Sequence, residues 1–426
     1  MQNITTKRLK NGMKLIHERR AGSTISAVSI RLKAGAVYGE KPGVAHFLEH
    51  LVLDGTKNYP TKNELENLVS ECGGRGGGKT WYEDVWYWAL VPSHTLDSAL
   101  KYVFEATFQP LLREEDFIRE QKVVFQEAKR HESQSSSLSY DKAQSLLFSG
   151  TPFARRVLGT PEEVMNVQHK DAIDFWTKRY LPHNAVLSVV ADMDFESIVK
   201  LVEEIFFWDE EKNTSISPTL FQFSDIRSPS LSFIDDSQAD QNRVLISYRA
   251  PTFFDETKPA VDMLATILGG GKTSRLFKAV RHEKGLSYDT SASVSSDSEC
   301  GKFGISSGTT PELLPELFDI VCREVLRMCT EECTDGELEP ARERSIFNYY
   351  VKNERAQERT ESLSWFALHA EHPEEFLDIE SRYAKVTKKD IQDAAKTIFA
   401  SFPAVVVVKR TTDTISIDPD NLVYRG

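Results

Sequence analysis

The sequence predicts an α+β protein whose 426 residues form two similar domains. Three observations support this prediction. Short segments with alternating apolar residues recur between longer segments whose apolar residues follow helical spacing. A stretch at 211–229, rich in Ser, Asp and Pro, has little periodicity and is typical of a linker. The parts on either side of it, 1–210 and 230–426, contain sequences that align with each other.

Strands and helices are predicted from these two periodicities. In the segment 24–33, Val28, Ile30 and Leu32 share one face, as in a half-buried strand. Further strands are predicted at 86–91, 185–191, 243–249 and 404–408. Helices are predicted at 61–71, 96–108, 114–132 and 198–207, where apolar residues follow the helical repeat.

The segment HFLEH places His46 and His50 four residues apart, with Glu49 beside the second histidine. On an α-helix, positions i and i+4 lie about 5 to 6 Å apart on one face, so two imidazoles there can share one metal ion. Glu49 would then stand next to the metal, where a carboxylate can take a proton from bound water. This order, H-x-x-E-H, is that of the inverzincin metallopeptidases.

The surroundings of HFLEH decide whether the string is more than chance, since about one chain in fifty with this histidine content would contain it. The surrounding run is mostly apolar and predicts a largely buried helix that begins near Pro42 and ends near Gly55. A buried helix rarely carries two histidines and a glutamate without a use, because each must be hydrogen-bonded or metal-bound. We therefore interpret the segment as part of a metal site.

A third ligand is expected from the helix predicted at 114–132, where Glu120 and Glu127 share one face two turns apart. Taken alone, two such glutamates are more often a solvated helix face. However, 76 residues separate His50 from Glu127. With this spacing the chain resembles the family of pitrilysin, insulin-degrading enzyme and the mitochondrial processing peptidases, in a short two-domain form.

The resemblance implies a metal site and an architecture. His46, His50 and Glu127 would bind one Zn²⁺ per chain, Glu49 would be the general base, and Glu120 would support a ligand from outside the metal shell. The family fold implies that each domain is a mostly antiparallel sheet with helices packed on one face, and that the two domains form one half of a clamshell.

The second half of the chain contains R-x-x-x-G-L-x-Y, matched by Arg281, Gly285, Leu286 and Tyr288. In the family, an Arg and a Tyr at this spacing reach the active site and hold the substrate, so the resemblance implies a catalytic and substrate-binding role for Arg281 and Tyr288. Without the resemblance, a surface position for Arg281 and a core position for Tyr288 would be as good an interpretation as a functional role.

The segment GGRGGGKT at 73–80 matches the phosphate-binding pattern G-x-x-x-x-G-K-T. A phosphate-binding loop needs a strand before it and a helix after it. Here a predicted helix precedes the segment and an aromatic strand follows, which disfavours nucleotide binding. The family usually has G-G-x-x-N-A-x-T on a substrate-pairing edge strand. This chain has Gly77 and Gly78 in place of Asn-Ala and keeps Thr80, so these three residues are expected to bind substrate through the main chain.

Tryptophans follow the glycine-rich segment at positions 81, 86 and 88. They could line a cleft, but aromatic residues at alternating strand positions are more often part of a core.

The two halves align around HFLEH, with the Lys-Pro pair at 41–42 placed on the pair at 258–259. In that alignment the second copy carries apolar or hydroxyl side chains where the first has its histidines and glutamate, namely Met263, Thr266 and Ile267. This is the pattern expected of a duplication in which one metal site survives.

Composition excludes several classes. The net charge of −12 disfavours nucleic acid as a partner. No apolar run approaches a membrane span and 1–15 lacks a signal-peptide core, so we expect a cytoplasmic protein without membrane contact. Five cysteines without C-x-x-C argue against a disulfide framework. Cys322, Cys329 and Cys333 are expected to be buried thiols on either side of a helix break, because Thr334 and Glu337 form a capping box.

The sequence thus predicts a zinc endopeptidase that cuts peptides or unfolded segments inside a closed chamber. A chain of two domains needs a partner to enclose a peptide, so a homodimer is expected, with a heterodimer of related chains as the alternative. The competing function is a non-catalytic structural or chaperone-like family member. The presence of His46, Glu49, His50 and Glu127 disfavours this alternative.

Overall fold

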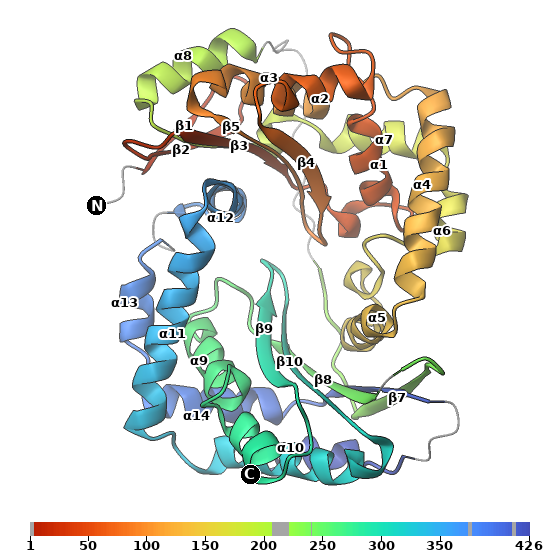
Figure 1. The fold of residues 1–426 in the computed structure, drawn as a ribbon, viewed down its shortest axis with the longest axis vertical. Helices are drawn as coiled ribbons and strands as arrows, with labels where there is room; N and C mark the ends of the chain where they lie inside the picture. Colours follow the sequence, from red (N-terminus) through yellow and green to blue (C-terminus); the bar gives the residue numbers. More distant parts are fainter. Residues whose placement is uncertain (1–3, 207–220, 240, 374–376, 411–414) are drawn as a thin grey trace. The chain divides into compact units, whose positions relative to one another are not determined.

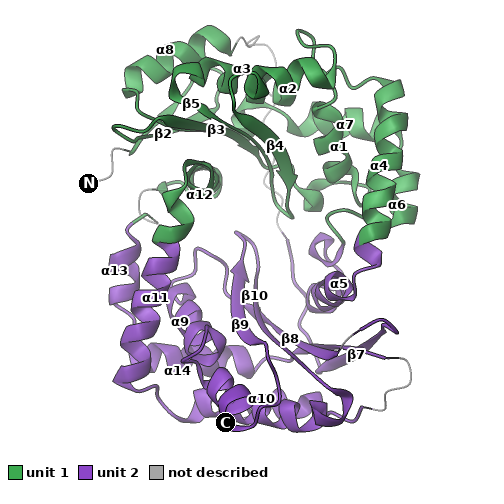
Figure 2. Cartoon of the chain, in the orientation of Figure 1, with its two compact units in different colours: residues 1–130, 156–220, 350–377 green, residues 131–155, 221–349, 378–426 purple. Residues whose placement is uncertain are grey.

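The computed structural model describes residues 4–206, 221–239, 241–373, 377–410 and 415–426 (Figure 1). The chain forms two compact units (Figure 2). The first contains 1–130, 156–220 and 350–377, and the second contains 131–155, 221–349 and 378–426. Residues 211–220 of the predicted linker lie outside the described ranges.

The first unit is built on a six-stranded sheet in the order β1-β2-β6-β3-β5-β4. All neighbouring strands are antiparallel except β2 and β6, which are parallel. The predicted strand at 24–33 is the central strand β3, and its Val28, Ile30 and Leu32 are completely buried. The strands are β1 (Ile4–Arg8), β2 (Lys14–Arg19), β3 (Ile25–Leu32), β4 (Arg75–Thr80), β5 (Val85–Pro92) and β6 (Ala185–Ala191).

Helices of the first unit cover the apolar face of this sheet. Helix α3 packs on β3 and β5, and α8 packs on α3, so that one hydrophobic core lies between sheet and helices. The helices are α1 (Val44–Val52), α2 (Lys62–Ser70), α3 (Leu96–Phe108), α4 (Glu114–Glu132), α6 (Pro161–Asn166), α7 (His169–Arg179) and α8 (Phe195–Ile205).

The second unit repeats this plan with five strands in the order β7-β11-β8-β10-β9. The order is that of β2-β6-β3-β5-β4 in the first unit, and β7 and β11 again form the parallel pair. The strands are β7 (Ser230–Asp235), β8 (Asn242–Ala250), β9 (Thr290–Ser296), β10 (Gly301–Thr309) and β11 (Ala404–Lys409). The fold is therefore α+β with two similar, mostly antiparallel domains, as predicted.

Helices α9 and α14 pack together in the core of the second unit, with α10 against both. Its helices are α5 (Ser135–Leu147), α9 (Lys258–Gly269), α10 (Leu314–Thr330), α11 (Asp335–Glu354), α13 (Ile379–Ala384) and α14 (Lys388–Phe399). Cys322, Cys329 and Cys333 are all buried free thiols, and α10 ends at Thr330 between the second and the third, as expected.

One helix from each half of the sequence packs on the sheet formed by the other half of the sequence. Helix α5 belongs to the second unit and packs on β8 and β11. Helix α12 (Ala356–His369) belongs to the first unit and packs on β3 and β6. It covers the sheet face that carries Ser29 and Arg31, opposite the face with the main core. Each sheet is thus completed by a segment from the other side of the linker.

A buried ion pair and a buried hydrogen bond hold α12 on the first sheet. The Arg31 guanidinium pairs with Asp84, and its Nε donates to Ser364 Oγ on α12 at 3.1 Å. The Arg359 Nε of α12 donates to Glu18 Oε2 on β2 at 2.6 Å. Because these charged groups are buried, each needs its partner. The Arg359–Glu18 pair and the hydrogen bond from Arg31 to Ser364 fix where α12 lies along the sheet.

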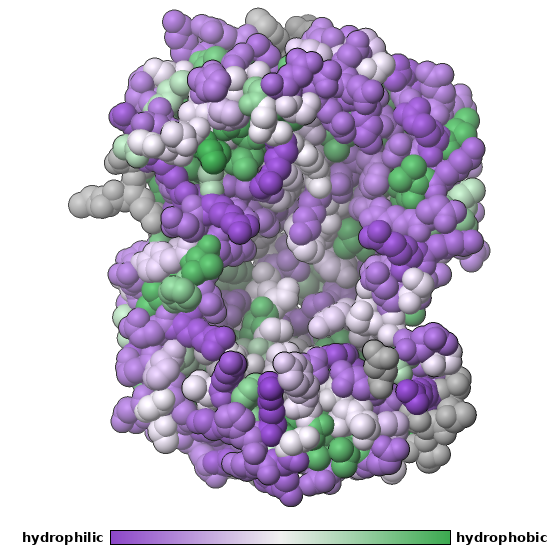
Figure 3. Space-filling view, in the orientation of Figure 1, coloured by the Kyte–Doolittle hydropathy of each residue, from purple (hydrophilic) through white to green (hydrophobic). Residues whose placement is uncertain are grey.

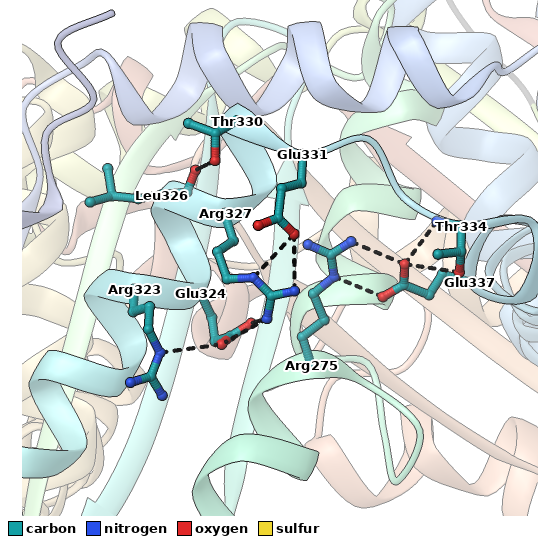
Figure 4. A network of polar contacts seen from close by, with 9 residues as sticks. All are labelled: Arg275, Arg323, Glu324, Leu326, Arg327, Thr330, Glu331, Thr334 and Glu337. Atoms are coloured by element: carbon teal, nitrogen blue, oxygen red, sulfur yellow. Dashed lines mark hydrogen bonds and ion pairs between the residues drawn. The ribbon is translucent and has the colours of Figure 1, made fainter.

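A second polar network fixes the segment that follows α9 in the second unit (Figure 4). Arg275 makes a bidentate pair with Glu337, at 2.7 Å and 3.0 Å, and Glu337 also accepts from the backbone N–H of Thr334 at 2.9 Å. This second contact is one of the two hydrogen bonds of the predicted capping box at the start of α11. The loop before residue 277 is therefore attached to a helix terminus by charged hydrogen bonds.

Surface polarity agrees with the composition. Hydrophilic side chains dominate the face shown in Figure 3, and apolar ones are scattered over it. Within the described ranges, every helix is too short or too polar to cross a membrane.

Candidate metal centre

Helix α1 holds the HFLEH segment in a mostly apolar environment. Its apolar side chains lie in the core of the first unit, and Glu49 is buried with them. The helix starts after Gly43, whose φ of 81° is readily adopted only by glycine. A Cβ at this position would lie 2.8 Å from the Leu158 carbonyl oxygen. The tight approach of 158–159 thus fixes the start of α1.

The structure brings His46, His50 and Glu127 together, as the sequence predicts. One ligand atom of each residue lies within 4.8 Å of the other two. The Oε2 atom of Glu127 is 3.9 Å from His46 Nε2 and 3.5 Å from His50 Nε2. Atoms that share a tetrahedral zinc ion at 2.0 to 2.1 Å are about 3.4 Å apart, so small side-chain adjustments suffice to bind one.

The charges of this group also fit a cation. Burial opposes a charge on His50, but hydrogen bonds to Glu120 and Glu127 raise its pKa to about 9. Burial and the neighbouring His50 lower the pKa of His46 to about 4. The pKa of Glu127 is lowered, chiefly by its hydrogen bond to His50. Without a metal ion, a proton on His50 therefore supplies the positive charge between these ligands, and a divalent cation can replace it.

Glu120 lies behind His50. Its Oε2 is 3.3 Å from His50 Nδ1, the nitrogen on the far side of the ring from Glu127. A carboxylate in this place fixes the orientation of a ligating imidazole and keeps Nε2 free for the metal. Glu120 is thus in hydrogen-bond contact with His50, and its role toward a metal stays a prediction.

Sequence reasoning did not identify the charged groups around Glu120. Asp54, just beyond α1, is almost fully buried and lies 3.2 Å from Arg119 and 3.6 Å from Lys62. Burial and the charge of Glu120 raise the pKa of Asp54 to about 6. These residues line a pocket of about 280 Å³ next to Glu120. The sequence did contain a signal for Asp54, which is four residues after His50, because positions i and i+4 share a helix face.

The Glu49 carboxylate contacts β4. Its Oε2 accepts a hydrogen bond of 2.6 Å from Thr80 Oγ1. Burial raises the pKa of Glu49, although the Thr80 contact works against this. A Cβ at Gly78 would lie only 2.8 Å from Glu49 Cγ, so the missing side chain at 78 makes room for the carboxylate. The contacts of Thr80 and Gly78 with Glu49 were not foreseen, since the sequence suggested substrate contacts for both.

The glycine-rich segment at 73–80 is mainly the edge strand β4, between α2 and β5. It lacks the strand-loop-helix order of a phosphate-binding loop. Within the described residues, β4 pairs only with β5, so one edge of its main chain is available to another strand. Of the three tryptophans nearby, Trp86 is buried, Trp88 is half-buried and Trp81 is 40% exposed.

Arg281 and Tyr288 lie together in the second unit. Arg281 is on a π-helical turn, Phe277–Glu283. Its guanidinium lies 4.3 Å from the centre of the Tyr288 ring and donates to the Tyr288 carbonyl at 3.2 Å. Tyr288 is 79% exposed, so it is not a core aromatic residue. The two side chains are accessible to a ligand of the second unit, and their role toward substrate stays a prediction.

Known proteins share sequence and fold with this chain. Residues 14–161 match the family model "Insulinase (Peptidase family M16)", and 166–345 match "Peptidase M16 inactive domain". An uncharacterised zinc protease of Rickettsia bellii is 27% identical over 415 residues, which cover 96% of this chain and 98% of the relative. An uncharacterised zinc protease of Bacillus subtilis is 24% identical over 78% of this chain and 80% of its own length.

Two solved structures share the fold. A protease from Helicobacter pylori superposes with a TM-score of 0.88 at 20% identity, covering 96% of this chain and 100% of that structure. A peptidase M16 inactive domain from Pseudomonas fluorescens gives 0.85 at 16% identity, covering 98% and 100%. From the two matching family models, the full-length relatives and the fold, the chain belongs to peptidase family M16, the pitrilysin family, in its short two-domain form.

Proposed function

We propose that this protein is a zinc endopeptidase in which His46, His50 and Glu127 bind the metal and Glu49 is the general base. The observation that carries the proposal is the convergence of three ligand atoms beside a buried glutamate from the same helix. The names of the curated relatives support zinc and proteolysis as the general class.

A zinc ion bound by three protein ligands polarises a carbonyl and lowers the pKa of a bound water to about 7. Glu49 accepts a proton from the attacking water and later donates it to the leaving amine. Its raised pKa favours the first step, because a carboxylate with a higher pKa is a better proton acceptor. Thr80 holds one carboxylate oxygen, which leaves the other for the water.

The substrate is a peptide or unfolded segment in extended conformation. It adds to the free edge of β4, where main-chain groups from Gly77 to Thr80 provide hydrogen bonds. Arg281 and Tyr288 bind the substrate from the second unit. We further propose a homodimer that encloses the peptide, which size-exclusion chromatography with light scattering would test. A monomer would contradict this part of the proposal.

The proposal is tested by metal analysis together with cleavage of a quenched fluorogenic peptide. The expected result is about one zinc per chain and cleavage that a chelator abolishes and zinc restores. Glu49→Gln should keep the zinc and lose cleavage by about 10²-fold or more. Glu127→Gln is the matched variant, which should lose the metal. A zinc-loaded wild type that cleaves no peptide in a broad library would instead favour the non-catalytic alternative.

A further inference from the structure

Strand β4 carries glycine at three successive positions, and these face two sides of the sheet. Gly76 and Gly78 face the side of α1 and α3, since a Cβ there would meet Tyr102 and Glu49 respectively. Gly77 faces the opposite side because side chains alternate along a strand. The edge strand therefore has no side chain between Arg75 and Lys79 on the side away from Glu49.

The Trp88 indole lies next to the position that a side chain at Gly77 would take. The two residues are direct partners in the antiparallel pairing of β4 and β5. A Cβ at Gly77 would lie 3.4, 3.5 and 3.6 Å from the indole atoms Cζ2, Cε2 and Nε1, which is ordinary van der Waals contact. The indole of Trp88 thus lies beside Gly77, on the side of the sheet away from Glu49. Trp88 is only half-buried, so part of this surface is accessible.

A peptide strand added to β4 would place one side chain on this indole. Directly paired residues of neighbouring strands point to the same side of the sheet. The substrate residue opposite Gly77 therefore points to the side of Trp88 and finds no neighbouring side chain on β4 itself. The nearest side chain on that side of the sheet is the indole of Trp88, which lies beside Gly77 on the next strand.

We propose that Trp88, exposed through Gly77, forms a selectivity subsite for an aromatic or large apolar side chain of the substrate. The inference rests on the proposed peptidase function and on strand addition to β4. The positions before and after on the same side are Arg75 and Lys79, both exposed. Opposite charges paired across strands attract, so acidic residues two positions from the aromatic one are favoured. The preferred substrate pattern is acidic-x-aromatic-x-acidic.

The test is a series of fluorogenic peptides that differ only in having Phe or Ala at one position, scanned along the peptide. For wild type, one position should show a kcat/KM that is about three- to tenfold higher with Phe, the range expected for an aromatic contact. Trp88→Leu and Gly77→Ile should bring this ratio close to one, the second by covering the indole. Trp365→Leu, which changes another half-buried tryptophan of the same unit, is the matched control and should keep the ratio.

A binding measurement separates this inference from the proposed chemistry. Labelled Phe and Ala peptides are titrated against zinc-loaded Glu49→Gln, with and without Trp88→Leu, and followed by fluorescence anisotropy. If the aromatic preference is seen and depends on Trp88 while wild type cleaves nothing, the subsite stands and the peptidase proposal fails. If wild type cleaves peptides but the Phe/Ala ratio is the same in every variant, the subsite is refuted and the peptidase proposal stands.

Discussion

Replacing Glu120 with glutamine is expected to weaken zinc binding about 30- to 100-fold. In the wild type, Glu120 Oε2 lies 3.3 Å from His50 Nδ1, and the Glu120 side chain is only 6% exposed. When Nε2 of the imidazole binds a metal, Nδ1 carries the proton and donates it to this carboxylate. Glutamine has nearly the same size, so the substitution removes the negative charge and leaves the packing of α4 in place.

The magnitude follows from the position of this carboxylate. Substitution of a residue that hydrogen-bonds a metal ligand typically costs 10- to 100-fold in metal affinity. The upper part of that range applies because the Glu120 carboxylate is buried and its pKa is lowered first of all by the hydrogen bond to His50. A loss of 30- to 100-fold corresponds to about 2 to 2.7 kcal/mol of binding free energy.

The assay is a competition for zinc with a chromophoric chelator at pH 7.5, combined with metal content after dialysis. Glu115→Gln on the same helix is the matched control, because this glutamate is 76% exposed and should leave the affinity unchanged. Glu127→Gln removes a ligand and should weaken binding far more. An affinity of Glu120→Gln within twofold of that of Glu115→Gln would refute the role assigned to Glu120.

Three further results are expected. Gly78→Val should lower kcat/KM at least tenfold with zinc content unchanged, because its Cβ would lie 2.8 Å from Glu49 Cγ; full activity would contradict the assigned position of Glu49. The pKa of His50 without metal is about 9, so zinc binding at pH 7 should release one proton, and apparent affinity should rise about tenfold per pH unit up to pH 9 and then level off. Calorimetry in buffers of different ionisation enthalpy measures this release, and binding at pH 7 without it would be the contrary result. Arg359→Met should lower the free energy of unfolding by about 3 kcal/mol, because it leaves buried Glu18 without that partner. Denaturant unfolding measures this change, and an unchanged free energy would contradict the importance of the pair.

The sequence was sufficient to predict the elements with strong periodicity. The strand predicted at 185–191 is β6, the helices at 96–108 and 114–132 are α3 and α4, and the strand at 24–33 is β3 within one residue at each end. Strand β4 was implied only by the family resemblance, because Gly77 and its neighbours have low strand propensity. Pairing with β5 and contact with the Trp88 indole stabilise the strand in place of local propensity.

The positions of α5 and α12 could not be predicted from local patterns. A periodic pattern shows which face of a helix is apolar, but it does not show which sheet the helix packs on. The alternation in β3 indicated only one apolar face, yet Ser29 and Arg31 on the other face are also almost completely buried, beneath α12. Arg31 is tolerated there because Asp84 and Ser364 satisfy its charge and its donors.

The comparison of α1 with α9 shows what the metal site requires of its helix. Both helices follow the corresponding strand of sheets with the same strand order. In α9, Met263 and Ile267 occupy the aligned histidine positions and are buried in the apolar core of the second unit. Histidines at such positions would need buried polar partners, and in α1 these partners come from α4. The two histidines of α1 are therefore stable in a mostly apolar helix because glutamates of α4 face them. For this reason the spacing between His50 and Glu127 in the sequence was informative.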